Sequence, residues 1–219
     1  KKYEEETNLR CQLIIDSSSS MYYPDFKSTT LKNPNKILFS IISAMSLMNL
    51  LKKQRDAVGL SSYSEKLNIH TLAKTTMRHH QLIYHELEKI LRIDTLKERR
   101  RSSFSSSIHH IAERIHKRSL IMVFSDMITD DNLESVFSAF KHLKYKQHEV
   151  ILFYLVEPKT ELDFSFKNQP HKFIDVETGE ELKLNPAQFK EHYQKESKQY
   201  LKDLKLQCLK HKIDFVTID

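Results

Sequence analysis

The chain has 219 residues, 39% of them hydrophobic and 29% charged, which excludes a disordered or fibrous protein and indicates a globular one with a sizeable core. It contains only two glycines, Gly59 and Gly179, so it has neither a Walker A loop nor a dinucleotide fingerprint, both of which need clustered glycines near phosphate. The net charge of +6 is spread through predicted helices that also carry acids, and only Arg99-Arg100-Arg101 forms a tight basic block.

Hydrophobic patterning divides the chain into alternating strands and helices. Residues 9–15 and 57–63 are apolar runs with the length of buried strands, and residues 37–53 between them have helical spacing, with Pro34 near the helix start. The same criteria predict strands at 67–72, 120–124, 150–156 and 213–218, helices at 77–93, 104–116, 133–143 and 187–209, and a hairpin excursion at 172–184.

This order of elements predicts an α/β fold, with a doubly wound, mostly parallel central sheet, helices on both faces and one antiparallel edge strand. Because no internal linker divides the chain, we expect a single domain over residues 1–219, with 172–184 as a hairpin insertion. The sequence starts at Lys1 without a methionine, so we expect a C-terminal fragment of a longer chain.

No segment is predicted to span a membrane. The longest uncharged stretch in the first half, residues 37–51, is shorter than the roughly 20 residues needed to cross a bilayer and contains three serines and an asparagine. We expect no signal peptide. Cys11 lies in an apolar run and Cys208 in a helical pattern, where free thiols usually act as small hydrophobes. We therefore expect a cytoplasmic protein.

The loop that leaves the first predicted strand carries a carboxylate and two hydroxyls at alternating positions, Asp16, Ser18 and Ser20. Asp126 follows the strand at 120–124, and sites in parallel sheets lie outside the carboxyl ends of the strands. Oxygen-only ligands suit a hard cation such as Mg²⁺, which takes few protein ligands and keeps several waters. The alternative is a serine-rich turn in which Asp16 caps the following helix.

Several short segments occur in a distinctive order and spacing. They are residues 2–10 (KYEEETNLR), 16–21 (DSSSSM), 55–60 (RDAVGL), 124–126 (FSD), 148–150 (HEV), 173–180 (FIDVETGE) and 213–216 (IDFV). Together they show that the sequence resembles, over nearly its whole length, the domain-of-unknown-function 58 family of bacterial von Willebrand factor A-like proteins. The resemblance implies the α/β fold of that superfamily.

The resemblance also implies a metal-ion-dependent adhesion site, whose pattern is Asp-x-Ser-x-Ser, then a distant Thr and a distant Asp. These positions correspond to Asp16, Ser18, Ser20, Ser102 and Asp126. Two departures weaken the site, because Ser103 stands where the family usually has Asp, and Arg99 to Arg101 add positive charge that disfavours a cation. We therefore expect weak and conditional binding of Mg²⁺ or Mn²⁺.

The function that the resemblance implies is a non-enzymatic protein–protein interaction module. A cation with an open coordination position could take the carboxylate of a partner's Asp or Glu. Family members are often linked to MoxR-type AAA+ ATPases, which implies a chaperone-like assembly with such an ATPase as partner. Arg100 and Arg101 could instead receive the partner's carboxylate through bidentate hydrogen bonds, without a metal.

Two other functions remain as alternatives. A metal-dependent phosphatase of the haloacid-dehalogenase type would need a second Asp two residues after a nucleophilic Asp16, where this chain has Ser18. Binding of nucleic acid through the basic surface would need a recognised motif or a concentrated basic patch, and the sequence has neither.

Two predicted helices carry three histidines each. These are His79, His80 and His85, and His109, His110 and His116. Helical spacing does not bring all three of either set together, so we expect exposed helix histidines rather than zinc ligands.

Overall fold

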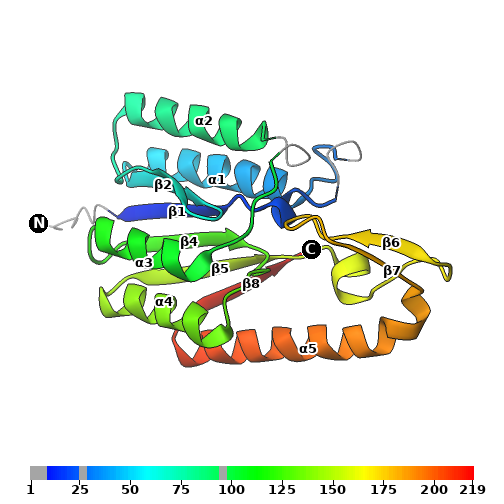
Figure 1. Ribbon diagram of the computed structural model, residues 1–219. Helices are drawn as coiled ribbons and strands as arrows, with labels where there is room; N and C mark the ends of the chain where they lie inside the picture. The colour runs from blue at the N-terminus through cyan, green and yellow to red at the C-terminus, as the bar shows by residue number, and fades with distance from the viewer. Residues whose placement is uncertain (1–8, 25–28, 94–97) are drawn as a thin grey trace, which may run out of the picture.

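The centre of the molecule is a six-stranded sheet with the strand order β3-β2-β1-β4-β5-β8 (Figure 1). The computed structural model describes residues 9–24, 29–93 and 98–219. The strands of this sheet are β1 (Arg10–Asp16), β2 (Ala57–Tyr63), β3 (Leu67–His70), β4 (Leu120–Ser125), β5 (Glu149–Leu155) and β8 (Asp214–Ile218). Neighbouring strands pair in parallel except at one edge, where β3 pairs antiparallel with β2.

Helices cover both faces of the sheet (Figure 1). On one face lie α1 (Lys36–Lys53) and α2 (Met77–Leu91), and on the other lie α3 (Phe104–Arg114), α4 (Leu133–Tyr145) and α5 (Pro186–Lys210). The predicted α/β fold, doubly wound around a mostly parallel sheet with an antiparallel edge strand, is therefore confirmed. Helix and strand ends agree with the sequence prediction to within two residues.

β1 is buried on both of its faces. Leu13 and Ile15 belong to the core beneath α1 and α2, whereas Ile14 belongs to the core beneath α3 and α4, because successive side chains of a strand point to opposite faces. All three side chains are fully buried, and each such burial stabilises the fold by about 1.5–3 kcal/mol. This two-sided packing fixes the carboxyl end of β1 in the middle of the sheet edge.

Asparagine side chains cap three of the helices. Asn35, Asn132 and Asn185 each accept a hydrogen bond from a backbone amide of the first turn, at 3.0, 2.8 and 3.2 Å, and such a cap contributes about 1 kcal/mol. Because Asn35 occupies the cap of α1, the helix begins at Lys36, two residues after the proline that the sequence placed near its start.

The antiparallel strands β6 (His171–Ile174) and β7 (Glu181–Leu184) form a separate hairpin. It lies beyond the carboxyl ends of the parallel strands, on the side where β1 and β4 end (Figure 1). The turn that joins β6 to β7 is therefore placed near the candidate site. Two short elements were not predicted, the 3-10 turn Ser19–Tyr22 and the π-helical turn Pro158–Leu162, because elements of this length carry no measurable periodicity.

The prediction of exposed helix histidines is wrong for two of them. His79 and His80 on α2 are only 7% and 2% exposed. His79 Nε2 lies 3.0 Å from the backbone oxygen of Val58, whereas neither ring nitrogen of His80 has a hydrogen-bond partner among the described residues. These rings belong to the packing of α2 on the sheet.

Across residues 9–24, 29–93 and 98–219, no helix has both the length and the apolar character that a membrane span requires. Cys11 and Cys208 are buried free thiols, as their apolar patterns predict.

Candidate metal centre

Two carboxylates end neighbouring strands at the carboxyl edge of the sheet. β1 and β4 pair in parallel with Ile15 opposite Phe124, so Asp16 and Asp126, which follow them along each strand, reach the same edge. Asp16 is 0% and Asp126 2% exposed. Since water does not reach these side chains, protein groups or a bound ion must stabilise their charges.

The hydrogen-bond donors that the described chain offers to Asp16 are all neutral. Its Oδ1 accepts a hydrogen bond from Ser18 N at 2.9 Å. Its Oδ2 accepts from the hydroxyls of Tyr63 at 3.1 Å, Ser102 at 3.1 Å and Ser125 at 3.0 Å. These four bonds orient the carboxylate but bring no formal positive charge to it.

This environment raises the pKa of Asp16. Burial, and after it the negative charge of Asp126, raises the pKa of Asp16 to about 6, against the lowering effect of hydrogen bonds from Ser18 and Ser125. Burial and the charge of Asp16 also hold the pKa of Tyr63 well above its usual value, which keeps its phenol a donor. A nearby cation would act in the opposite direction and stabilise the ionised carboxylate.

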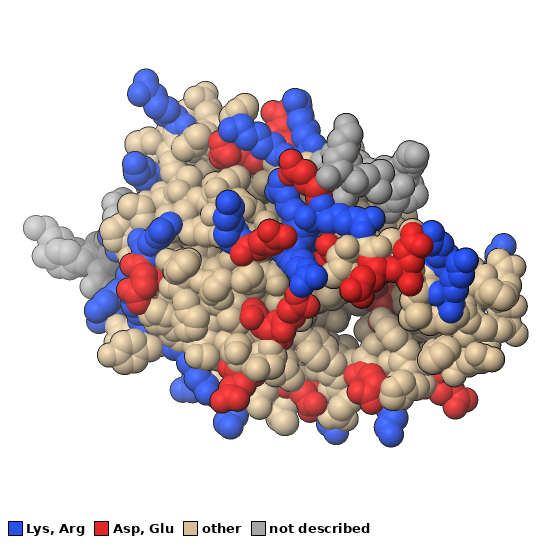
Figure 2. Space-filling view, viewed as in Figure 1, with Lys and Arg blue, Asp and Glu red and all other residues tan. Residues whose placement is uncertain are grey.

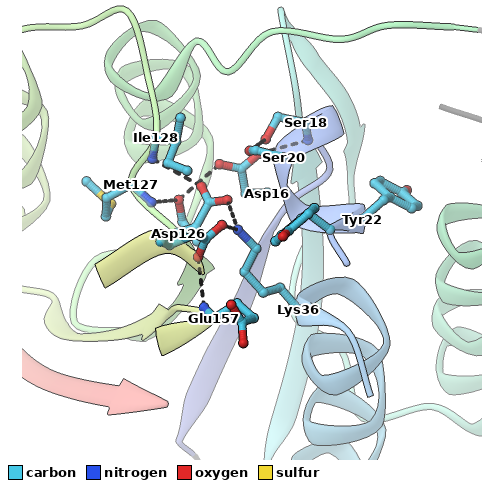
Figure 3. Close-up of polar contacts among 12 residues, drawn as sticks. Asp16, Ser18, Ser20, Tyr22, Lys36, Asp126, Met127, Ile128 and Glu157 are labelled. Atoms are coloured by element: carbon cyan, nitrogen blue, oxygen red, sulfur yellow. Dashed lines mark hydrogen bonds and ion pairs between the residues drawn. The ribbon is translucent and has the colours of Figure 1, made fainter. Parts of the chain in front are cut away.

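The 3-10 turn after β1 folds the chain back so that two hydroxyls face each other beside Asp16 (Figure 3). The Oγ atoms of Ser18 and Ser20 are 3.1 Å apart, and both residues are buried. Adjacent ligands of an octahedral Mg²⁺ are about 3.0 Å apart, because Mg–O distances are about 2.1 Å. The two hydroxyls therefore have the spacing of neighbouring metal ligands.

Asp126 differs from Asp16 in that a buried ammonium group faces it (Figure 3). Lys36 Nζ lies 2.7 Å from Asp126 Oδ2 and 2.6 Å from Glu161 Oε1. Burial lowers the pKa of Lys36, but the charges of Asp126 and Glu161 outweigh it, so the pKa is raised and the amine stays charged. The other Asp126 oxygen accepts a hydrogen bond from Ile128 N at 3.1 Å. A metal that contacted Asp126 would have to share it with Lys36.

The segment before α3 brings the third hydroxyl into the site. Ser19 N donates to Arg100 O and Arg100 N donates to Ser19 Oγ, both at 2.9 Å. This pair of bonds aligns the segment with the loop after β1, and two residues later Ser102 Oγ reaches Asp16.

The two arginines predicted to face a partner already have acidic neighbours. The Arg100 guanidinium pairs with Glu98, and Arg101 Nη1 lies 3.3 Å from Asp130 Oδ2. The Arg101 side chain is 54% exposed, against 25% for Arg100. Their role in binding a partner's carboxylate stays a prediction.

A further carboxylate enters the site from the hairpin. Ser102 N donates to Glu177 Oε2 at 3.3 Å, whereas Glu177 Oε1 is buried and has no hydrogen-bond partner in the described part of the chain. Burial raises the pKa of Glu177 to about 7; the Ser20 hydroxyl opposes this rise, and the charges of Asp16 and Asp126 add to it.

The structure gathers the residues that the sequence marked as metal ligands. These are Asp16, Ser18, Ser20 and Ser102, which form one hydrogen-bonded cluster, and Asp126, which lies beside it on the next strand. That they bind Mg²⁺ or Mn²⁺ stays a prediction.

Four residues of the site were missed in the sequence. They are Lys36, Tyr63, Ser125 and Glu177. Ser125 stands directly before Asp126, and Glu177 lies in a segment that carries the family resemblance, so both had a signal. Nothing in the sequence pattern marks Lys36 or Tyr63.

The side chains fit a hard divalent cation. The candidate ligands are all oxygens, and Glu177 Oε1 is a buried acceptor without a positive partner. Among the described residues, no three His, Cys, Asp or Glu side chains are placed to hold a metal by themselves. Serine hydroxyls and water would have to complete the shell, which suits Mg²⁺ better than zinc.

Two solved structures with TM-scores above 0.5 share this fold at low sequence identity. An aerotolerance-related membrane protein from Bacteroides fragilis NCTC 9343, with multiple mutations to serines, has a TM-score of 0.58 and 14% identity, covering 96% of this chain and 92% of that one. The conserved hypothetical protein BatB from Bacteroides thetaiotaomicron has a TM-score of 0.54 and 13% identity, covering 96% and 90%. A third solved structure, the SpRpn10 VWA domain, has a TM-score of 0.47 and 11% identity, covering 96% of this chain and 87% of that one.

Sequence comparison identifies the family. No curated protein matches the sequence. The family model described as "Protein of unknown function DUF58" matches residues 1–202, a range that includes all five predicted metal ligands and Glu177. The chain therefore belongs to the DUF58 family, and it has the mostly parallel α/β fold expected from the resemblance.

Proposed function

We propose that this chain is a protein-interaction module that binds Mg²⁺ or Mn²⁺ beside Asp16 and uses the cation to hold an acidic residue of a protein partner. The observation that supports this is the buried Asp16 carboxylate, whose donors are neutral and whose neighbours include serine hydroxyls at ligand spacing. A cation there would stabilise the carboxylate charge that burial disfavours.

The serine hydroxyls of the cluster would hold the cation, with the Asp16 carboxylate stabilising its charge. A cation with so few protein ligands keeps positions for water, and a partner's carboxylate can replace one of those waters. Such a contact neutralises charge and needs no chemical step.

We propose no catalytic role for the site. A phosphatase of the haloacid-dehalogenase type needs an acid/base group two residues after the nucleophile. Ser18 stands there, and its hydroxyl is bonded to that of Ser20. In addition, Asp16 Oδ2 already receives three hydroxyl hydrogen bonds, which leaves it poorly placed for attack.

The partner we propose is a protein, and specifically a MoxR-type AAA+ ATPase in the cytoplasm, as the family resemblance implies. Nucleic acid is a poorer candidate. Figure 2 shows lysine and arginine side chains interleaved with aspartate and glutamate over the visible face, without one continuous basic surface.

Calorimetric titration of the purified chain with Mn²⁺ tests the metal site. We expect binding with a dissociation constant weaker than about 10 μM, and its loss in Asp16→Asn and Ser20→Ala. Ser46→Ala, which changes an exposed serine of α1, is the matched control and should bind as the wild type does. Equal affinity in Asp16→Asn and the wild type would refute the proposed site.

Capture of a MoxR-type ATPase encoded in the same genome tests the partner. We expect capture in Mg²⁺ to be lost in EDTA and in Ser20→Ala. Capture that survives both conditions would show that recognition of the ATPase does not use the cation.

A further inference from the structure

The turn of the β6–β7 hairpin is held in a defined conformation by Asp175. Its Oδ1 accepts hydrogen bonds from Glu177 N at 2.7 Å and Thr178 N at 2.9 Å. Its backbone N donates to Glu180 O at 2.9 Å, and its backbone O accepts from Gly179 N at 2.8 Å. These four bonds fix the backbone from which the Glu177 side chain extends.

The same turn is docked onto the segment that carries Ser102. Gly179 has a φ of +81°, and a Cβ at this position would lie 1.0 Å from Arg99 Nη1, so the guanidinium covers the turn where glycine leaves space. Ser102 N then donates to Glu177 Oε2. Two contacts with one segment therefore hold the hairpin against the candidate site.

The Glu177 carboxylate has few hydrogen-bond donors, so a nearby cation would stabilise its ionised form. Its Oε1 is buried without a hydrogen-bond partner among the described residues, and the hydrogen bond to its Oε2 is long at 3.3 Å. The negative charges of the Asp16 and Asp126 carboxylates also repel a negative charge on Glu177. A buried acceptor left without a donor destabilises the folded state.

The nearby ammonium group does not compensate for this cost. Lys36 is bonded to both Asp126 and Glu161. Ser102, in contrast, joins Glu177 to Asp16, because its backbone N donates to Glu177 Oε2 and its hydroxyl donates to Asp16 Oδ2. The place where a cation would relieve Glu177 is therefore the place proposed for the metal.

We propose that Glu177 is an internal ligand of this cation, so that the hairpin occupies the coordination position that a partner's carboxylate takes when it binds. The inference rests on the proposed function. It adds that the resting site is closed by the protein's own glutamate, and that a partner must displace the hairpin turn, which makes binding weaker and conditional on a competing carboxylate.

Glu177→Gln tests the inference, with Glu180→Gln as the control, because Glu180 is an exposed acid of the same turn. We expect Glu177→Gln to weaken Mn²⁺ binding about tenfold in calorimetry and to add one exchangeable water to bound Mn²⁺, measured by water-proton relaxation. Glu180→Gln should change neither quantity. Acetate, used as the probe carboxylate, should bind Mn²⁺-loaded Glu177→Gln more tightly than the Mn²⁺-loaded wild type.

Hydrogen exchange gives a second measurement that does not depend on the variant folding normally. Mn²⁺ should slow amide exchange of residues 175–180 in the wild type, and excess acetate should reverse that slowing.

The outcomes separate this inference from the proposed function. If the wild type binds Mn²⁺ and Asp16→Asn does not, but Glu177→Gln matches the wild type in affinity and hydration, the internal ligand is refuted and the metal site stands. If the wild type does not bind Mn²⁺ at all, both are refuted. Unchanged exchange of residues 175–180 on Mn²⁺ binding also refutes the internal ligand.

Discussion

Asp16 and Asp126 end adjacent parallel strands and are almost equally buried, yet their surroundings differ in charge. Around Asp16 the donors are one backbone amide and three hydroxyls. At Asp126 the ammonium group of Lys36 supplies a full positive charge at 2.7 Å. One carboxylate is oriented by neutral donors alone, and the other shares a buried cation with Glu161.

The difference shows two separate contributions to the site. The topology of the sheet brings both carboxylates to the same edge, whereas side chains from other elements decide which of them is available to an external cation. Because Lys36 is engaged with Asp126 and Glu161, we expect a bound metal to lie on the Asp16 side, among Ser18, Ser20 and Ser102.

The largest expected effect is on stability, in Lys36→Met. Removing one partner of a buried ion pair leaves Asp126 and Glu161 uncompensated, which typically costs about 3–5 kcal/mol. The same variant should bind Mn²⁺ more tightly than the wild type, because Asp126 becomes free to stabilise the metal. Urea unfolding and calorimetry measure the two effects.

The control for this substitution is Lys53→Met, which removes an exposed lysine at the other end of the same helix. It should change the free energy of unfolding by less than about 0.5 kcal/mol. Adding Asp126→Asn to Lys36→Met should restore part of the lost stability. A loss below about 1 kcal/mol in Lys36→Met would show that the Asp126 side of the site does not depend on this ion pair.

A smaller effect is expected in the pH dependence of stability in EDTA. The pKa of Asp16 is raised in the folded state from 3.8 to about 6, so between these values the folded chain holds a proton that the unfolded chain has lost. The stabilisation associated with that proton is present at low pH and is lost as pH rises through about 6, by at most about 3 kcal/mol.

Urea unfolding of the wild type and Asp16→Asn across this pH range measures the effect. The free energy of unfolding of the wild type, relative to Asp16→Asn, should fall as pH rises, and saturating Mn²⁺ should abolish the fall because the cation replaces the proton. Parallel pH profiles for the two proteins in EDTA would indicate that the Asp16 carboxylate is already ionised at low pH and needs no external cation.

The fold was predictable because its signals are local. The apolar runs of β1 and β4 and the helical spacing of α1 each lie within one short stretch of chain, and the rule for parallel sheets then places Asp16 and Asp126 together. The contacts that distinguish these carboxylates are not local. Tyr63 is 47 residues from Asp16 and Ser125 is 109, while Lys36 is 90 residues from Asp126.

The position of Glu177 in the site also depends on contacts between residues that are far apart in the sequence. Strand patterns and Thr178-Gly179 predict the hairpin itself, since they are contained within it. Its docking depends on Arg99 and Ser102, which lie in a different segment. The family resemblance includes residues 173–180, but no pattern within residues 172–184 indicates that contact. The sequence therefore predicts the turn without showing that Glu177 reaches the site.

The smallest expected effect concerns the arginines next to Ser102. From the sequence, Arg100 and Arg101 add positive charge that should weaken metal binding, and their replacement by serine should strengthen it. In the structure Arg100 pairs with Glu98 and Arg101 with Asp130, so much of that charge is already balanced. Ion pairs that are this exposed contribute only about 0–1 kcal/mol.

We therefore expect Arg100→Ser and Arg101→Ser to change the Mn²⁺ dissociation constant by no more than about threefold. This is far less than the change expected in Lys36→Met, because the Lys36 ammonium is buried and bonded directly to a carboxylate of the site. Calorimetry at low and at high salt checks both the size and the origin of the effect. A tenfold or greater gain in affinity for either arginine variant, lost at high salt, would show that the segment before α3, rather than the Lys36–Asp126 pair, sets the electrostatic balance of the site.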